Sequence, residues 1–173
     1  MTRINSAIPV RNLTDEHLLA EHREIKRLPY CLARAVSSGT IQNVPKSFTL
    51  GKGHVLFFLD KQSFIRKRYQ DIHAECIRRG FDVKNYEDNW NFVQEPYNKD
   101  YEPTNEERRM LEERITDRIL NGKKEFYHYC GNRIDKREAA QLLVYPRIHP
   151  VGFGKITEKN RNRCRQKEKT VFY

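Results

Sequence analysis

Apolar positions recur at helical spacing in three segments of the chain, residues 14–39, 61–79 and 104–121. Side chains three and four positions apart lie on one face of a helix, so each segment is predicted to be a helix with one buried face. Thr14 is expected to cap the first helix, and Pro29 to kink or restart it. The apolar stripes comprise Leu18, Leu19, Ile25, Leu28 and Leu32 in the first segment and Phe64, Ile65, Ile72, Cys76 and Ile77 in the second.

The intervening segments carry turn-forming residues and little strand pattern. Residues 40–59 are expected to be extended or turn-like, and residues 81–103 form a loop rich in Asn, Asp, Tyr and Pro. We therefore predict an all-α fold, a compact three-helix domain with long loops over residues 1–138, followed by a basic extension over residues 139–173. Residues 155–169 carry seven Lys or Arg against two Glu, which indicates either a mobile basic arm or a short element packed on the domain.

Composition narrows the classes of partner. Of the 173 residues, 38% are hydrophobic and 11% aromatic, which is enough to build a core and excludes wholesale disorder. The net charge of +10 favours polyanions, with nucleic acid as the first expectation and an anionic membrane surface as the second. No apolar run is long enough to span a bilayer, and the N-terminus lacks the apolar core of a signal peptide.

The cysteines show no metal-binding pattern. None belongs to a CxxC pair or has a histidine nearby at zinc-ligand spacing, so we expect reduced thiols and no metal site. They are Cys31, Cys76, Cys130 and Cys164.

Thr2 is the first candidate for chemistry. Removal of Met1 before a small residue would expose the α-amine of Thr2, which ordinarily has a pKa of roughly 7.7–8.0, far below that of a lysine. A neutral amine can form a Schiff base, and positive charge from Arg3 and the first-helix arginines would lower the pKa of the amine further. The simpler alternative is that Thr is a common second residue with no chemical role.

The first predicted helix places His17, Glu21 and Glu24 near one face, with Arg23 and Arg27 flanking Glu24. A carboxylate among arginines stays ionised, and it could stabilise a developing cation at a sugar C1′ or move protons in an elimination. An ordinary surface of salt bridges fits the same spacing.

Two further stretches carry basic residues that could bind nucleic acid. The segment "DKQSFIRKRY" could follow a phosphate backbone or form a solvated helix face. In "KKEFYHYCG", the aromatic rings could stack on unpaired bases or close the core. The "GKG" at residues 51–53 is interpreted as a tight turn, because it lacks the length and ending of a phosphate-binding loop.

Several blocks together resemble a known family. "MTRIN", "HLLAEHRE", "LGKGHVLFF", "DKQSFIRKR" and "AECIRRGF" are closely similar to the pyrimidine-dimer DNA glycosylases of T-even bacteriophages, the endonuclease V family. The similarity runs in the same order from residue 1 to about residue 81, weakens over residues 82–103 and resumes in the third helix. "FYHYCG" resembles the aromatic segment that ends the family protein.

The resemblance implies a fold, an activity and a site. It implies a compact three-helix domain whose N-terminal segment threads between helices. The implied activity excises UV-induced cyclobutane pyrimidine dimers through an imine on the N-terminal amine, then cleaves the strand by β-elimination at the abasic site. The partner is double-stranded DNA containing UV lesions, and no membrane is involved. A monomer in a bacterial or phage-infected cytoplasm is expected. No metal or cofactor is needed, because the amine itself captures the electrophilic carbon.

The resemblance also assigns residues by motif. It makes Thr2 the nucleophile and Glu24 the catalytic acid, and it links His17 to the lyase step. The residues expected to bind DNA or the lesion are Arg3, Arg23, Arg27, His17, Arg114, Arg118, Tyr127, His128 and Tyr129.

The chain also departs from the family pattern. Phe126 stands where the family has Trp, His128 where it has Lys, and Cys130 where it has Tyr. The residues after about 139 are additional. A glycosylase of the same chemistry for another base lesion, and a non-catalytic protein that binds damaged DNA, are the two alternatives.

Overall fold

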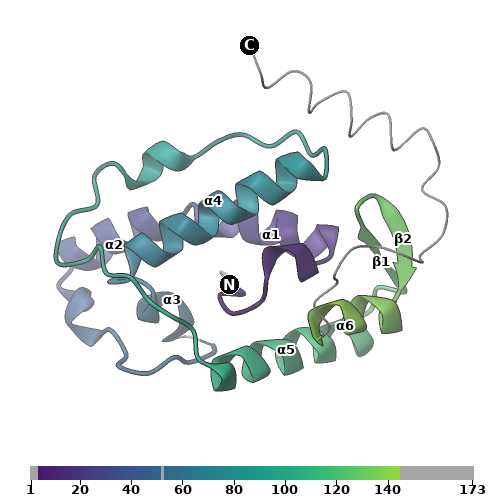
Figure 1. Ribbon diagram of the computed structural model, residues 1–173. Helices are drawn as coiled ribbons and strands as arrows, with labels where there is room; N and C mark the ends of the chain where they lie inside the picture. Colours follow the sequence, from purple (N-terminus) through teal and green to yellow (C-terminus); the bar gives the residue numbers. More distant parts are fainter. Residues whose placement is uncertain (1–3, 52, 145–173) are drawn as a thin grey trace, which may run out of the picture.

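The computed structural model describes residues 4–51 and 53–144 and is mainly helical, as predicted (Figure 1). Thr2, Arg3 and the basic stretch at 155–169 lie outside the described residues. The helices are α1 (Asp15–Ile25), α2 (Leu28–Ser37), α3 (Gly53–Phe57), α4 (Gln62–Arg78), α5 (Asn105–Leu120) and α6 (Lys136–Val144). Strands β1 (Phe126–Tyr129) and β2 (Asn132–Asp135) pair as an antiparallel hairpin. Short 3-10 turns cover Val10–Asn12, Thr40–Asn43 and Glu87–Trp90.

The first predicted helix is two helices. Thr14 caps α1, because its side chain accepts a hydrogen bond from the backbone N–H of His17. Pro29 lies in the first turn of α2, where its missing N–H costs nothing. The chain therefore restarts at Leu28 after a break at Lys26 and Arg27, one of the two outcomes expected of Pro29.

Helices α4 and α5 agree with the predictions to within a residue at each end. Thr104 and Glu107 form a reciprocal capping box at the start of α5. The expectation of extended structure over residues 40–59 is wrong where α3 forms. This short helix turns the side chains of His54 and Phe57 into the core, and burial of that apolar run outweighs the cost of so short a helix.

The β-hairpin is the second departure from the expected helices and loops. Its turn places Cys130 at φ 51° and Gly131 at φ 77°. Positive φ at both central residues is typical of a type I′ turn, for which Asn-Gly is the preferred sequence. A cysteine in this left-handed region is strained relative to Asn or Gly.

Cys130→Asn is expected to stabilise the protein by about 1 kcal/mol, because it relieves this strain and keeps the backbone bond to α1. Denaturant unfolding with unchanged m-value measures the effect. Gly131→Ala is the matched opposite change and should destabilise by a similar amount. A Cys130→Asn protein no more stable than the parent contradicts the strain.

The N-terminal segment runs through the centre of the fold. In Figure 1 it lies between the pair α1 and α4 on one side and α5 on the other. Ile4, Ile8 and Leu13 are fully buried and belong to the main core, together with Leu18, Ile25, Ile65 and Ile115. Burying three aliphatic side chains contributes roughly 2 kcal/mol each, so the segment is an integral part of the core. This placement matches the threading that the family resemblance implied.

Helix α6 extends the domain past residue 138, where the extension was expected to begin. It packs on α5, and it buries Ala139, Leu142 and Leu143. The first residues of the extension are therefore part of the core. No helix among the described residues is long and apolar enough to cross a membrane.

Candidate active site

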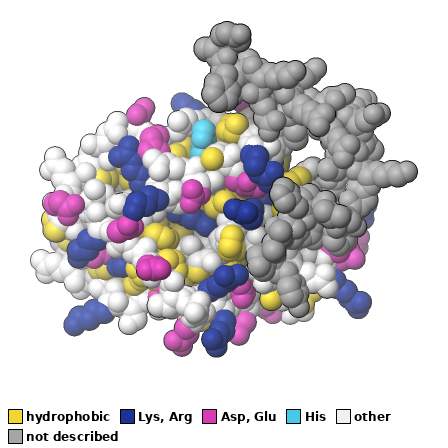
Figure 2. Space-filling model, in the orientation of Figure 1, with side chains coloured by type: hydrophobic (Ala, Val, Ile, Leu, Met, Phe, Trp, Pro, Cys, Tyr) yellow, Lys and Arg dark blue, Asp and Glu magenta, His cyan; other side chains and the backbone are white. Residues whose placement is uncertain are grey.

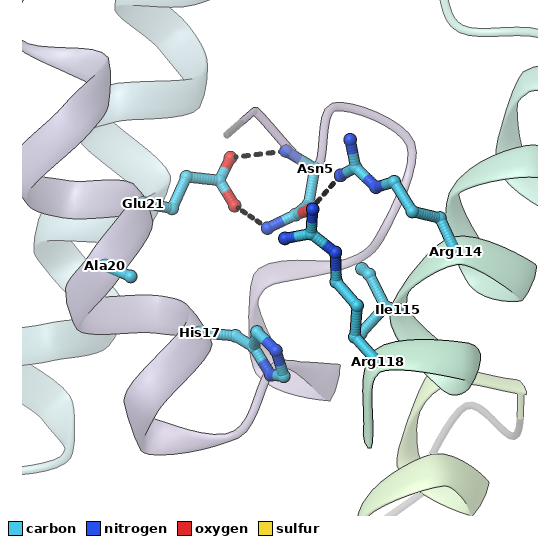
Figure 3. Close-up of a pocket in the computed structure, with 7 residues that line it drawn as sticks. All are labelled: Asn5, His17, Ala20, Glu21, Arg114, Ile115 and Arg118. Carbon is cyan, nitrogen blue, oxygen red and sulfur yellow. Dashed lines mark hydrogen bonds between the residues drawn. The ribbon is translucent and has the colours of Figure 1, made fainter. Parts of the chain in front are cut away.

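A pocket opens between α1 and α5, with the N-terminal segment at its wall (Figure 3). Helix α1 contributes one face and α5 the other, so groups far apart in sequence converge. The lining residues are Asn5, His17, Ala20, Glu21, Arg114, Ile115 and Arg118. Three of these, His17, Arg114 and Arg118, belong to the set predicted from the sequence.

Glu21 is the most constrained side chain at the pocket. Its carboxylate is fully buried and accepts from Asn5 twice, from the backbone N–H at 3.1 Å and from Nδ2 at 2.8 Å. Arg68 donates to the same carboxylate from Nε at 3.0 Å and from Nη2 at 3.2 Å. Both oxygens thus have two donors, so the buried charge is compensated. Sequence reasoning placed Glu21 on this face but gave it no role.

Glu24 lies one turn along α1 and is not among the lining residues. Its side chain is 30% exposed, and its Oε2 lies 3.4 Å from Nη1 of Arg27. Arg23 and Arg27 are exposed beside it. Glu24 is therefore accessible to a ligand, and its one weak ion pair within the described residues leaves its carboxylate oxygens available.

The two α5 arginines differ in their partners. Arg114 donates from Nη2 to Oδ1 of Asn5 at 2.8 Å, which ties α5 to the N-terminal segment. Arg118 forms no ion pair with any residue in the described part of the chain, although it lines the pocket. An arginine without a counter-charge beside a pocket is suited to a phosphate.

His17 is held at the mouth of the pocket. Its Nδ1 lies 2.8 Å from Oγ1 of Thr14, and its ring stacks on Tyr127 with centroids 5.7 Å apart. Tyr127 is only 6% exposed, and burial raises the pKa of its hydroxyl. The Tyr127 ring therefore faces the core and His17, and its surface is covered.

The β-hairpin is fastened to the first turn of α1. Asp15 accepts from the backbone N–H groups of Cys130 and Gly131 at 3.0 and 2.8 Å. Glu16 accepts from the backbone N–H of His128 at 3.1 Å, with Nδ1 of the same histidine also 3.1 Å away. Burial alone raises the pKa of Glu16, but the His128 hydrogen bonds outweigh it and hold that pKa below its ordinary value. Helix α1 therefore both holds the hairpin and lines the pocket.

Tyr129 lies on the same hairpin and is not among the lining residues of the pocket. Its hydroxyl donates to the Arg11 carbonyl at 2.9 Å, and the Arg79 guanidinium lies 4.7 Å from its ring centroid. The structure thus brings His128 to the first turn of α1 and Tyr129 to the turn at Val10–Asn12 and the end of α4, and neither residue lines the pocket.

The basic segment of α4 does not form a continuous row of open cations. Nε of Arg66 lies 2.6 Å from Glu87, Lys67 pairs with Asp100, and Arg68 is buried against Glu21. On the face shown in Figure 2, Lys and Arg side chains alternate with Asp and Glu. The sequence after residue 144 carries +6 of the net charge of +10.

His54 fastens the N-terminal segment at the residue before Asn5. Its Nδ1 lies 3.1 Å from the Thr49 carbonyl oxygen, and its Nε2 lies 3.0 Å from the carbonyl oxygen and 3.2 Å from the backbone nitrogen of Ile4. Burial, and then the charge of Arg114, lower the pKa of His54, which favours the neutral imidazole.

The family comparison agrees with this geometry. A family model described as pyrimidine dimer DNA glycosylase matches residues 1–89. The match covers about half of the 173 residues, from the N-terminus through α1 and α4 to the 3-10 turn at Glu87–Trp90. Helix α5 and the hairpin lie beyond it, so their arginines and aromatics are placed by the structure alone. This chain is a member of the pyrimidine dimer DNA glycosylase family.

Proposed function

We propose that the protein excises UV-induced cyclobutane pyrimidine dimers from duplex DNA through an imine at Thr2, and then cleaves the strand as an abasic-site lyase. The observation that carries the proposal is the pocket itself. It joins His17 and two arginines to the N-terminal segment, three residues from Thr2, inside a chain of this family. That is where an N-terminal nucleophile could meet DNA.

The proposed reaction conserves atoms and charge with groups that the chain and DNA supply. The neutral Thr2 amine attacks C1′, and the N-glycosidic bond breaks with its electron pair leaving on the base, which is then protonated. Opening of the sugar ring at O4′ gives the C1′ imine. A base then removes a C2′ proton, and the C3′–O bond breaks with the phosphate as leaving group. Water hydrolyses the imine and frees the amine.

The described residues take distinct parts in this scheme. Glu24, accessible beside Arg27, stabilises the positive sugar and carries protons. Arg114 and Arg118 provide positive charge inside the pocket, and Arg23 and Arg27 contact phosphates outside it, with Arg3 as a further phosphate contact. His17 serves the elimination.

The hairpin residues fall into two groups. Because the ring of Tyr127 is covered, we propose that it holds His17 in place rather than stacking on a base. His128 and Tyr129 remain the hairpin residues proposed to meet DNA.

Borohydride trapping tests the imine directly. Protein with Met1 confirmed absent is incubated with a duplex containing one thymine dimer, beside a variant with one extra residue before Thr2. The extra residue removes the reactive amine from its place and should abolish the covalent adduct, while the salt-dependent affinity for DNA stays the same.

Two controls separate the alternatives. A duplex with an abasic site and one with a ring-opened purine are trapped in parallel. An adduct on these but not on the dimer assigns the chemistry to another lesion. No adduct on any duplex, with binding intact, identifies a non-catalytic DNA-binding protein and overturns the proposal.

A further inference from the structure

We infer that Glu21 and Asn5 form a clamp that positions the N-terminal nucleophile, so that Glu21 is a positioning residue of the reaction. The inference rests on the proposed function, because it concerns the same amine. It assigns a role to a second glutamate of α1, distinct from Glu24, and to Asn5, which bonds to Arg114 of α5.

The clamp fixes residue 5 through both its backbone and its side chain. Glu21 accepts the backbone N–H and the side-chain Nδ2 of Asn5, while Oδ1 of Asn5 accepts from Arg114 (Figure 3). Asn5 thereby bridges α1 and α5 across the pocket. Its side chain uses both its donor and its acceptor ends, so Asp or Leu could not replace it at this position.

A second contact restrains the preceding residue. Nε2 of His54 in α3 lies within hydrogen-bond distance of both the carbonyl oxygen and the backbone nitrogen of Ile4, whose side chain is fully buried. The backbones of two consecutive residues are therefore held by side chains of two different helices. Translation of the segment along the pocket is blocked, because it would break both contacts and expose Ile4.

The buried Glu21 carboxylate is not explained by a contribution to the stability of the fold. A buried ion pair such as Glu21 with Arg68 contributes little compared with well-packed apolar side chains of the same volume. Its value lies in specificity of position, since it offers a pair of acceptors at one fixed place on α1. The segment that it fixes carries the proposed nucleophile.

Chain geometry limits how far the amine can lie from the clamp. Three residues span at most about 10 Å, so the nitrogen of Thr2 is confined to that radius around the fixed Asn5 amide. A displacement of about 1 Å in a reacting group can cost on the order of 100-fold in rate. Loosening the clamp should therefore slow the formation of the imine far more than it weakens DNA binding.

The experiment compares two clamp variants with two matched controls. Glu21→Gln keeps the shape and removes the paired acceptors, whereas Asn5→Ala removes the side-chain bonds and leaves the Glu21 charge in place. Glu75→Gln is the control for a buried glutamate, because Glu75 accepts from Arg78 and Arg79 at the end of α4, outside the pocket. Asn89→Ala is the control for a bridging asparagine, which bonds Lys26 and Tyr30.

The measured quantities are the single-turnover trapping rate constant on abasic duplex at saturating protein, the Kd for that duplex and the melting temperature. We expect the rate constant to fall about 100-fold in Glu21→Gln and about 10-fold in Asn5→Ala, with Kd within about two-fold of the parent. The controls should lose comparable stability and keep the parental rate constant. Should Glu21→Gln fail to fold, Asn5→Ala decides alone, since it preserves the Glu21–Arg68 pair.

The outcomes separate this inference from the proposed function. Parental protein that forms no adduct refutes the imine itself. Parental protein that forms an adduct, with clamp variants as fast as their controls, refutes the clamp and leaves the imine intact. Equal slowing in clamp and control variants would assign the loss to general destabilisation and also overturn the inference.

Discussion

Glu24→Gln is expected to slow dimer excision by at least about 100-fold while the protein still binds dimer-containing duplex. The carboxylate would act only once positive charge develops on the sugar or a proton moves, steps in which a positioned acid or base typically contributes 10²–10⁴-fold. Glu24 is partly exposed and its only described ion pair is the 3.4 Å contact with Arg27, so the substitution leaves no buried charge behind. Stability should change little.

The measurement is the single-turnover rate of N-glycosidic bond cleavage in a duplex with one thymine dimer, followed as alkali-labile strand breaks. Glu102→Gln, an exposed carboxylate in the loop before α5, removes the same charge and controls for stronger non-specific binding. It should excise at the parental rate. Equal rates for the two variants would show that Glu24 is an ordinary surface residue, the alternative that its spacing to Arg27 also allows.

Glu21 and Glu24 of α1 have similar sequence surroundings, and only their burial distinguishes which of them could act as an acid. Glu21 and Glu24 are one turn apart and have arginine partners of similar kind. All the acceptor positions of Glu21 are occupied by Asn5 and Arg68, so it cannot stabilise a sugar cation without breaking the clamp. Glu24 keeps its oxygens accessible. This difference supports the proposed roles of Glu24 as the acid and of Glu21 as the anchor.

The long helices were predictable because local signals and burial agree there. Thr104 with Glu107 predicts the start of α5, and the apolar stripe of α4 predicts a helix that the core then confirms. Pro29 predicts the break after α1, though not which of kink or restart occurs. In these elements each local preference points to the same structure.

The rest depends on contacts between segments far apart in sequence. The hairpin has two four-residue strands and a Cys-Gly turn, so neither strand length nor turn sequence distinguishes it from a loop. It is held in place because Asp15 and Glu16, in the first turn of α1, accept its backbone N–H groups. The partners of Glu21, at positions 5 and 68, are equally invisible to local spacing.

The protein is expected to lose about 2 kcal/mol of stability between pH 7.5 and pH 5 through His22 alone. The pKa of His22 is lowered to about 4 by burial, and further by the charges of His73, Lys26 and Arg23. Its ring packs against those of Tyr69 and His73, with centroids 5.7 and 5.9 Å away, and its buried Nε2 has no hydrogen-bond partner among the described residues. A proton placed there meets no acceptor.

The sign follows from proton binding. In the unfolded chain His22 has its ordinary pKa near 6.5, so below that pH the unfolded state binds a proton that the native state refuses. The stability that neutral His22 contributes to the native state is complete above pH 6.5 and is lost as the pH falls toward 4. The pKa values of Glu16, Asp60 and Glu75 are also lowered, but the stability that these carboxylates contribute is lost only below about pH 4.5, outside this window.

His22→Phe keeps an aromatic ring in the stack and removes the titration. Urea unfolding of both proteins at pH 5.0, 6.0 and 7.5 should show a smaller pH dependence in the variant, by about 2 kcal/mol over the range. Some dependence will remain, because His54 is also buried with a lowered pKa and contributes with the same sign. Parallel pH dependences in the two proteins would show that His22 accepts its proton in the folded state, and that the stack beneath α1 opens to solvent.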